Sequence, residues 1–314
     1  MLTRVLDSLL ERRLVFVTGK GGVGKSTVAA ALGMVAAGRG LRTMVAELAG
    51  QQRVQRTFSR EQGTFVEVEL APNLHTISVD PERAMEEYLR LKVGPLGRIL
   101  NSSRVFNAFA MATPGMLDLL SIGKVWELAQ LERRTPGASP YDFVVVDAPA
   151  TGHGVGILRT PGTFAEIAKV GPIARQGHKI AETIADREFT GVLAVCTPEE
   201  MAVAETLALD EALAQQGLAL ELVILNALYP ARFADDEIEV LAAAMAGSPS
   251  NDARSALAAA RSEHARAQAQ RQLSGRLRGE LTAPIVELPY MFTDRIGPEQ
   301  LTALAADLGR ALSG

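Results

Sequence analysis

A run of nine residues near the start of the chain restricts its fold more than any other feature. Residues 19–27 read G-K-G-G-V-G-K-S-T, which matches the G-x-x-x-x-G-K-[ST] pattern of a phosphate-binding loop. The glycines allow the backbone to curl so that successive N–H groups point at phosphate oxygens. We expect Lys25 to reach the β- and γ-phosphates and the Ser26 hydroxyl to bind Mg²⁺. The pattern therefore predicts a site for ATP or GTP, in which the nucleotide contacts Gly19, Gly21, Gly22, Val23, Gly24, Lys25, Ser26 and Thr27.

The segments on either side of this loop predict an α/β fold. Residues 14–17 form a short apolar run before it, and the Ala-rich residues 28–37 favour a helix after it. Strand, loop and helix N-terminus thus come in the order that an anion site requires. Similar alternation along the chain indicates a mostly parallel central sheet with helices on both faces. The predicted strands are 14–18, 42–46, 74–79, 143–146, 192–196, 220–225 and 285–288, with helical subregions near 81–134, 161–187 and 235–280.

Composition narrows the class of protein. The 314 residues, 47% of them hydrophobic, are enough for one large domain over 1–314. A net charge of −4 argues against direct nucleic-acid binding as the main function. The single cysteine, Cys196, excludes an internal disulfide framework and a thiolate metal cluster made by one chain. We find no signal peptide and no apolar stretch near the ~18 residues needed to span a bilayer, so the expected location is cytoplasmic.

A second chemical element follows the predicted strand 143–146. That strand ends in Asp147, and the next residues read A-P-A-T-G-H up to His153. A carboxylate at the end of a buried strand beside the phosphate loop can hold Mg²⁺ through a bound water. Taken alone, His153 is more often a structural turn residue.

These motifs together resemble the ArsA-like ATPases, the family of anion-transporting and tail-anchored-protein-targeting ATPases. The early Lys20 resembles the second lysine of their deviant Walker A loop, and D-A-P-A-T-G-H resembles their switch II. The resemblance continues in the segments 77–81, 195–199, 205–206 and 223–230. It implies a dimer that closes on ATP, in which Lys20 crosses the interface to the partner's nucleotide. It also gives His153 a role in the switch.

The same resemblance implies how the base is recognised. Asn226 is the residue that reads the adenine edge, for which its amide offers a donor and an acceptor side by side. The backbone of Pro289, Tyr290 and Met291 surrounds the base, which favours ATP over GTP. Without the resemblance, Asn226 is as readily a turn residue at the end of a strand.

The chain departs from the family after its second strand. ArsA-like ATPases have an aspartate there that positions the attacking water, and the alignment gives Ala49 in this chain. Glu47, two residues earlier, is expected to bind the Mg²⁺ shell through water. Two hypotheses follow. The chain hydrolyses ATP slowly, or a related partner subunit completes the site. The chain looks most similar to paired actinobacterial ArsA-like ATPases, and it has neither the arsenite-binding cysteines nor the C-x-x-C zinc clamp of other members.

Two apolar segments leave alternatives open. Residues 2–10 have leucines at helical spacing, and we favour a helix packed on the sheet over a membrane-surface helix. Residues 163–186 favour a core-facing helix. The alternative is a groove for a hydrophobic protein client, shared with Met111, Met116, Leu117 and Leu120.

The sequence therefore predicts an ArsA-like dimeric ATPase. ATP binding and slow hydrolysis would couple conformational switching to binding of a protein or membrane client. The alternative is a ParA/MinD-like positioning ATPase that binds DNA or membrane when loaded with ATP. The T-G-H switch favours the first function. A homodimer and a heterodimer with a related ATPase both remain open.

Overall fold

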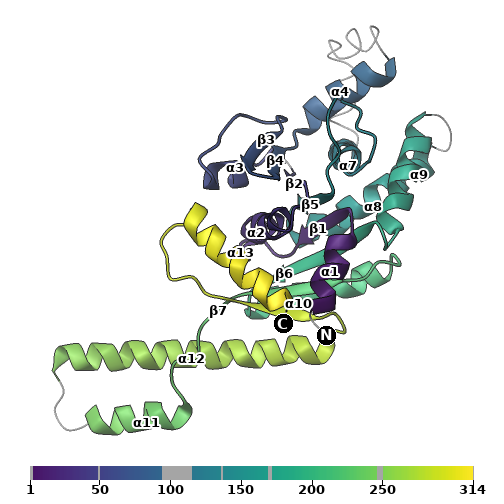
Figure 1. Ribbon diagram of the computed structural model, residues 1–314. Helices are drawn as coiled ribbons and strands as arrows, with labels where there is room; N and C mark the ends of the chain where they lie inside the picture. The colour runs from purple at the N-terminus through teal and green to yellow at the C-terminus, as the bar shows by residue number, and fades with distance from the viewer. Residues whose placement is uncertain are drawn as a thin grey trace.

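An eight-stranded sheet runs through the centre of the computed structural model (Figure 1). The structure describes residues 3–48, 50–93, 115–135, 137–168, 172–245 and 250–313. The strands are β1 (Leu14–Thr18), β2 (Thr43–Glu47), β3 (Val68–Ala71), β4 (Leu74–Ser78), β5 (Phe143–Asp147), β6 (Thr190–Cys196), β7 (Leu222–Leu228) and β8 (Ile285–Pro289). Those that align with the predicted strands confirm the α/β assignment.

The described helices alternate with these strands along the chain. They are α1 (Thr3–Glu11), α2 (Lys25–Gly38), α3 (Arg53–Thr57), α4 (Pro81–Val93), α7 (Met116–Leu128), α8 (Thr151–Ala168), α9 (Pro172–Ala185), α10 (Glu200–Ala214), α11 (Asp235–Ala244), α12 (Asn251–Glu280) and α13 (Pro298–Ser313).

The strand order is β3-β4-β2-β5-β1-β6-β7-β8, and every pair except β3–β4 is parallel. β1 therefore lies in the middle, with Phe16 aligned with Val146 of β5 and Val192 of β6. Because loops at the carboxyl ends of parallel strands meet at one edge of a sheet, this order brings the ends of β1, β2 and β5 together.

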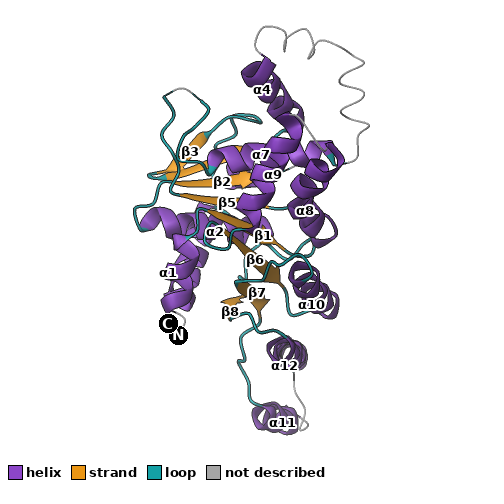
Figure 2. Cartoon of the chain, turned by 90° about the vertical axis from the view of Figure 1, so that its right-hand side faces the viewer, coloured by secondary structure: helices purple, strands orange, loops and turns teal. Residues whose placement is uncertain are grey.

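Helices cover both faces of the sheet (Figure 2). Helices α1, α2 and α13 lie on one face, where α13 contacts both of the others. Helices α7, α9 and α10 contact the strands from the other face. At the edge of the sheet formed by β8, α11 and α12 lie side by side and project from the body of the molecule.

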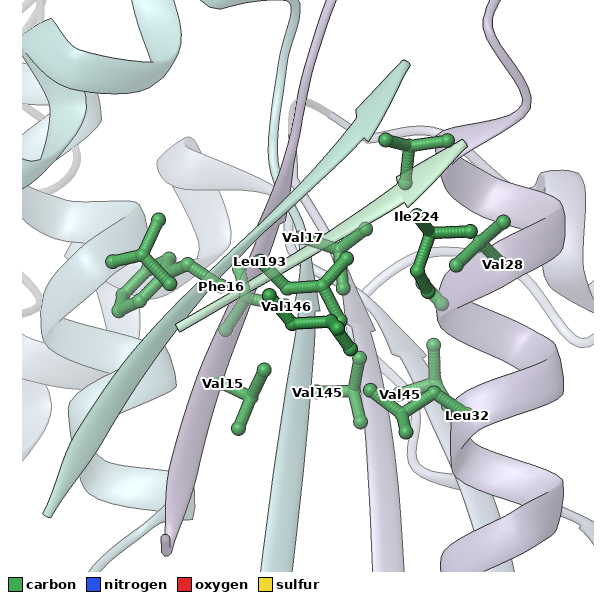
Figure 3. Packing of buried hydrophobic residues seen from close by; sticks show 14 of the residues in the cluster. Val15, Phe16, Val17, Val28, Leu32, Val45, Val145, Val146, Leu193 and Ile224 are labelled. Carbon is green, nitrogen blue, oxygen red and sulfur yellow. The ribbon is translucent and has the colours of Figure 1, made fainter. Parts of the chain in front are cut away.

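The core holds the phosphate loop in place through the helix that follows it. Figure 3 shows Val28 of α2 beside Ile224 and Leu32 beside Val45, and all four side chains are buried. Burial of each such side chain contributes about 1.5–3 kcal/mol to stability. The N-terminus of α2 is thereby fixed beside the carboxyl end of β1.

The N-terminal helix and the 163–186 region show which alternatives hold. Leu6 and Leu9 of α1 are buried in the main core, so this helix packs on the body of the molecule as favoured. Ile180 and Ile184 of α9 lie in the same core, which agrees with the core-facing interpretation for that helix. In the part of the chain that the structure describes, no helix has both the length and the apolarity to cross a membrane.

A buried ion network ties α7 to the edge of the sheet. Glu127 accepts hydrogen bonds from Lys124 Nζ at 3.0 Å, Arg133 Nε at 3.0 Å and the Arg134 backbone N–H at 2.9 Å. Arg133 also binds Glu67 at 2.6 Å, and Lys124 also binds Glu87 at 3.0 Å. Each charge in this network thus has a partner, which buried charges require.

Two differences from the predicted elements matter for the site. β2 ends at Glu47 and not at residue 46, so the Glu47 side chain belongs to the sheet and is fully buried. The short antiparallel strand β3 was not predicted. Only residues 68–71 form it, with alternating burial, so no long apolar run marks it in the sequence.

Candidate functional site

The phosphate loop lies between β1 and α2 and packs closely on two neighbouring strands. A Cβ at Gly19 would come within 2.1 Å of the Val195 carbonyl oxygen of β6, and a Cβ at Gly24 within 2.5 Å of Asn226 Nδ2. Both glycines also have positive φ, of 140° and 94°, a conformation that residues with a Cβ rarely adopt. Only glycine fits these two positions.

The two lysines of the loop point in different directions. Lys25 lines a cavity beside the loop, and its Nζ donates a hydrogen bond to the backbone carbonyl of Lys20 at 2.9 Å. Burial lowers the pKa of Lys25, and the nearby Asp147 opposes that shift. The Lys20 side chain is not part of the cavity wall, and its Nζ lies 3.9 Å from Glu205 of α10.

Asp147 at the end of β5 and Ser26 at the start of α2 form a hydrogen-bonded pair. The Ser26 hydroxyl donates to Asp147 Oδ2 at 2.5 Å, and Asp147 is only 5% exposed. Burial raises the pKa of Asp147, while the Ser26 hydrogen bond and the charges of Lys25 and Arg53 act against that rise. A hydroxyl and a carboxylate in contact give an oxygen donor set of the kind that Mg²⁺ prefers.

Glu47 lies next to Asp147 because β2 and β5 are paired with these two residues in register. Its Oε1 accepts hydrogen bonds from the backbone N–H groups of Arg53 at 2.7 Å and Val54 at 3.1 Å, which begin α3. Its Oε2 is buried and has no hydrogen-bond partner in the described structure. Burial raises the pKa of Glu47 to about 7, and the Asp147 charge acts in the same direction.

A cavity of about 200 Å³ extends from the phosphate loop. One wall is the loop and the start of α2, with Thr27 included, and the opposite wall is α3, through Arg53, Val54 and Thr57. Ile296 and Leu301 close it from the α13 side. Sequence reasoning missed these two apolar residues and the α3 wall, because neither belongs to a motif.

Asn226 lies within reach of the phosphate loop. Its Nδ2 donates a hydrogen bond to the backbone carbonyl of Val23 at 2.9 Å, and the next residue, Ala227, has a positive φ of 63°. The bond fixes the side chain at the end of β7, beside the loop. Its role at the adenine edge stays a prediction.

The segment predicted to surround the base follows β8. Pro289 ends that strand, and the Met291 side chain packs against the core. The Tyr290 ring stacks on Tyr229 with a centroid distance of 4.6 Å and lines a second cavity, beside α12. None of the three side chains lines the cavity at the phosphate loop, and the role of their backbone in base binding stays a prediction.

Several sequence predictions lie outside what the structure describes. These are Ala49 and Met111, and the side chains of His153, Phe164, Ile167 and Ile173. Met116 and Leu120, expected at a client groove, pack against Met85 and Leu89 of α4.

Comparison with known proteins agrees with this geometry. The family model for anion-transporting ATPases matches residues 12–176 and 165–246. ATPase BagA of Mycobacterium tuberculosis is 31% identical over 234 residues, which cover 72% of this chain and 68% of the relative. An arsenical pump-driving ATPase of Escherichia coli is 24% identical over 246 residues, covering 74% of this chain and 42% of the relative. ATPase GET3B of Arabidopsis thaliana is 24% identical over 277 residues, covering 72% and 66%.

Proposed function

The chain belongs to the anion-transporting ATPase family and is an ATPase, and we propose that it works as a dimer that closes on ATP. In this dimer, two phosphate loops face each other, and Lys20 of each subunit binds the nucleotide of the other. Closure on ATP and opening after hydrolysis would switch the binding of a protein or membrane client. The likeness to the family supports two parts of this proposal, the binding of a client and a cytoplasmic location.

The direction of Lys20 is the observation that carries this proposal. Lys25 lines the cavity of its own chain, whereas Lys20 points out of it toward Glu205. A lysine at an interface would offset the repulsion between two polyphosphates brought close together. The long, weak contact of 3.9 Å with Glu205, between partly exposed side chains, leaves Lys20 easy to redirect.

Mg²⁺ fits the residues at the loop. The Ser26 hydroxyl would bind the ion directly, and Asp147 and Glu47 would hold it through water. The buried, unpartnered Oε2 of Glu47 beside Asp147 supports this assignment, because a buried carboxylate oxygen without a partner is costly. When bound, Mg²⁺ would neutralise charge on the phosphates. The protein's part is to fix the loop, Lys25 and these oxygens in place.

The isolated chain is expected to hydrolyse ATP slowly. Ala49 stands where related ATPases have the water-positioning aspartate, and an alanine side chain has no group to orient water. Glu47 is not proposed as a substitute, because its Oε1 is occupied by the N–H groups of α3 and its Oε2 is assigned to the Mg²⁺ shell. A partner subunit, identical or related, is where the missing group would come from.

Sedimentation velocity with a non-hydrolysable ATP analogue and Mg²⁺ tests the dimer. The wild type should form dimers with the analogue and stay monomeric with ADP. Lys20→Ala should bind the analogue but fail to dimerise, and Lys20→Arg, which keeps the charge, should retain part of the dimerisation. Lys25→Ala is the variant for comparison, because it removes the other lysine of the loop and should abolish nucleotide binding. Equal dimerisation of Lys20→Ala and wild type would refute the shared site.

A further inference from the structure

An arginine outside every motif lines the same cavity as the phosphate loop. Among the described residues that line this cavity, only Lys25 and Arg53 carry a charge. The Arg53 side chain is exposed, and within the described ranges its guanidinium forms no hydrogen bond or ion pair. Arg56, one turn further along α3, lies near Glu61 and does not line the cavity. The two arginines of this short helix therefore have different surroundings.

The backbone of Arg53 is anchored to the end of the sheet at which the Mg²⁺ site is proposed. Glu47 accepts the Arg53 N–H at 2.7 Å, and the following Val54 and Gln55 are buried. A cation held there is placed beside the terminal part of a bound polyphosphate, because Lys25 and Asp147 mark that end of the loop. Its charge is felt at the site: burial lowers the pKa of Lys25 and Arg53 adds to that shift, whereas burial raises the pKa of Asp147 and Arg53 acts against that rise.

We propose that Arg53 binds the γ-phosphate of the nucleotide in its own chain, so that the site distinguishes a nucleoside triphosphate from a diphosphate. A guanidinium presents a flat fork of donors that matches two oxygens of a terminal phosphate. This contact would draw α3 toward the phosphate loop only while the γ-phosphate is present. The inference rests on the proposed binding of ATP at this loop.

The contact would also link the nucleotide to the short helix α3. Helix α3 is five residues long, and Glu47 holds it through two backbone hydrogen bonds. Loss of the γ-phosphate would remove the bond to Arg53 and leave those at Glu47. Helix α3 would then report the state of the nucleotide to the residues that follow it.

Equilibrium binding of a non-hydrolysable ATP analogue and of ADP, each with Mg²⁺, tests the inference. Arg53→Gln should weaken binding of the triphosphate by about tenfold or more, as expected for a lost charge-assisted hydrogen bond. Binding of ADP should change by less than about twofold, since the diphosphate has no group at that position. Arg53→Lys should fall between wild type and Arg53→Gln for the triphosphate, because it keeps the charge without the fork.

Arg56→Gln is the matched control. It removes the same charge from the same helix, and both nucleotides should bind as they do to the wild type. Circular dichroism should give the same Tm for Arg53→Gln and wild type, because the side chain is exposed.

The remaining outcomes overturn the inference. Equal weakening of both nucleotides by Arg53→Gln would place the arginine at the phosphates that they share. Unchanged binding of both would show that Arg53 does not touch the nucleotide. Failure of the wild type to bind either nucleotide would overturn the proposed function, and this inference with it, whereas a normal wild type with an insensitive Arg53 would overturn the inference alone.

Discussion

Replacement of Gly19 by alanine should displace the phosphate loop and also lower the stability of the fold. The added Cβ would lie 2.1 Å from the Val195 carbonyl oxygen, and real Cβ contacts are essentially never shorter than 3.0 Å. Val195 is part of the buried strand β6 and is fully buried. The loop, and not the strand, must therefore move, by about 1 Å.

The cost has two parts. An alanine at φ 140° is strained by roughly 1–3 kcal/mol, and overpacking against the strand adds about 1–3 kcal/mol. Together these costs predict a fall in Tm of about 3–9 °C for a chain of this length. A displacement of about 1 Å can slow a reaction that depends on exact alignment by about 10²-fold. It would also lengthen the hydrogen bonds from the loop to the phosphates, so nucleotide affinity should fall.

Differential scanning fluorimetry and fluorescence titration with an ATP analogue would measure the two effects. Gly21→Ala is the control for stability within the same loop, because its φ is not positive and its Cβ would meet no protein atom within 4 Å. It should keep the wild-type Tm. If Gly19→Ala also kept the wild-type Tm and bound the analogue as the wild type does, the close approach of the loop to β6 would not govern the site.

Two further predictions concern turnover and acid stability. Ala49→Asp should raise steady-state ATP hydrolysis by restoring a group that can orient water, and vigorous hydrolysis by the wild-type chain would contradict the alignment of Ala49. Burial alone would raise the pKa of Glu127, but Lys124 and Arg133 outweigh it and hold that pKa below its ordinary 4.5. The resulting stabilisation is present above pH 4.5 and is lost as the pH falls through the folded-state value. Glu127→Gln should cost about 3–5 kcal/mol at pH 7. Chemical denaturation should show a shallower acid dependence than in the wild type, whereas an equal dependence would locate the acid sensitivity elsewhere.

The sequence predicts most of the sheet because parallel strands covered on both faces are continuous apolar runs. β1, β2 and β5 are buried along their whole length, and each was recognised from such a run. β3 has half-exposed, alternating burial over four residues and escapes that signal. The end of β2 was also set one residue too early, since a glutamate rarely continues a buried strand.

The candidate site divides in the same way. The loop, Asp147 and Asn226 have motifs, and the structure brings them together through strand pairing and two hydrogen bonds, Ser26 to Asp147 and Asn226 to Val23. The bonds of Glu47 to α3 and the position of Arg53 depend on how a short helix folds back onto the sheet. No local pattern encodes that path, so these features could only be found in three dimensions.

The central position of β1 sets the order in which the chain can fold during synthesis. Leu14 aligns with Val144 on one side and Thr190 on the other. At about 5–20 residues per second, the ribosome needs roughly ten to thirty seconds to make both neighbours after β1. Through that interval the segment L-V-F-V-T, which ends up wholly buried, is without its strand partners. The apolar segment that leads into the phosphate loop is therefore a candidate for binding by a chaperone that acts on nascent chains.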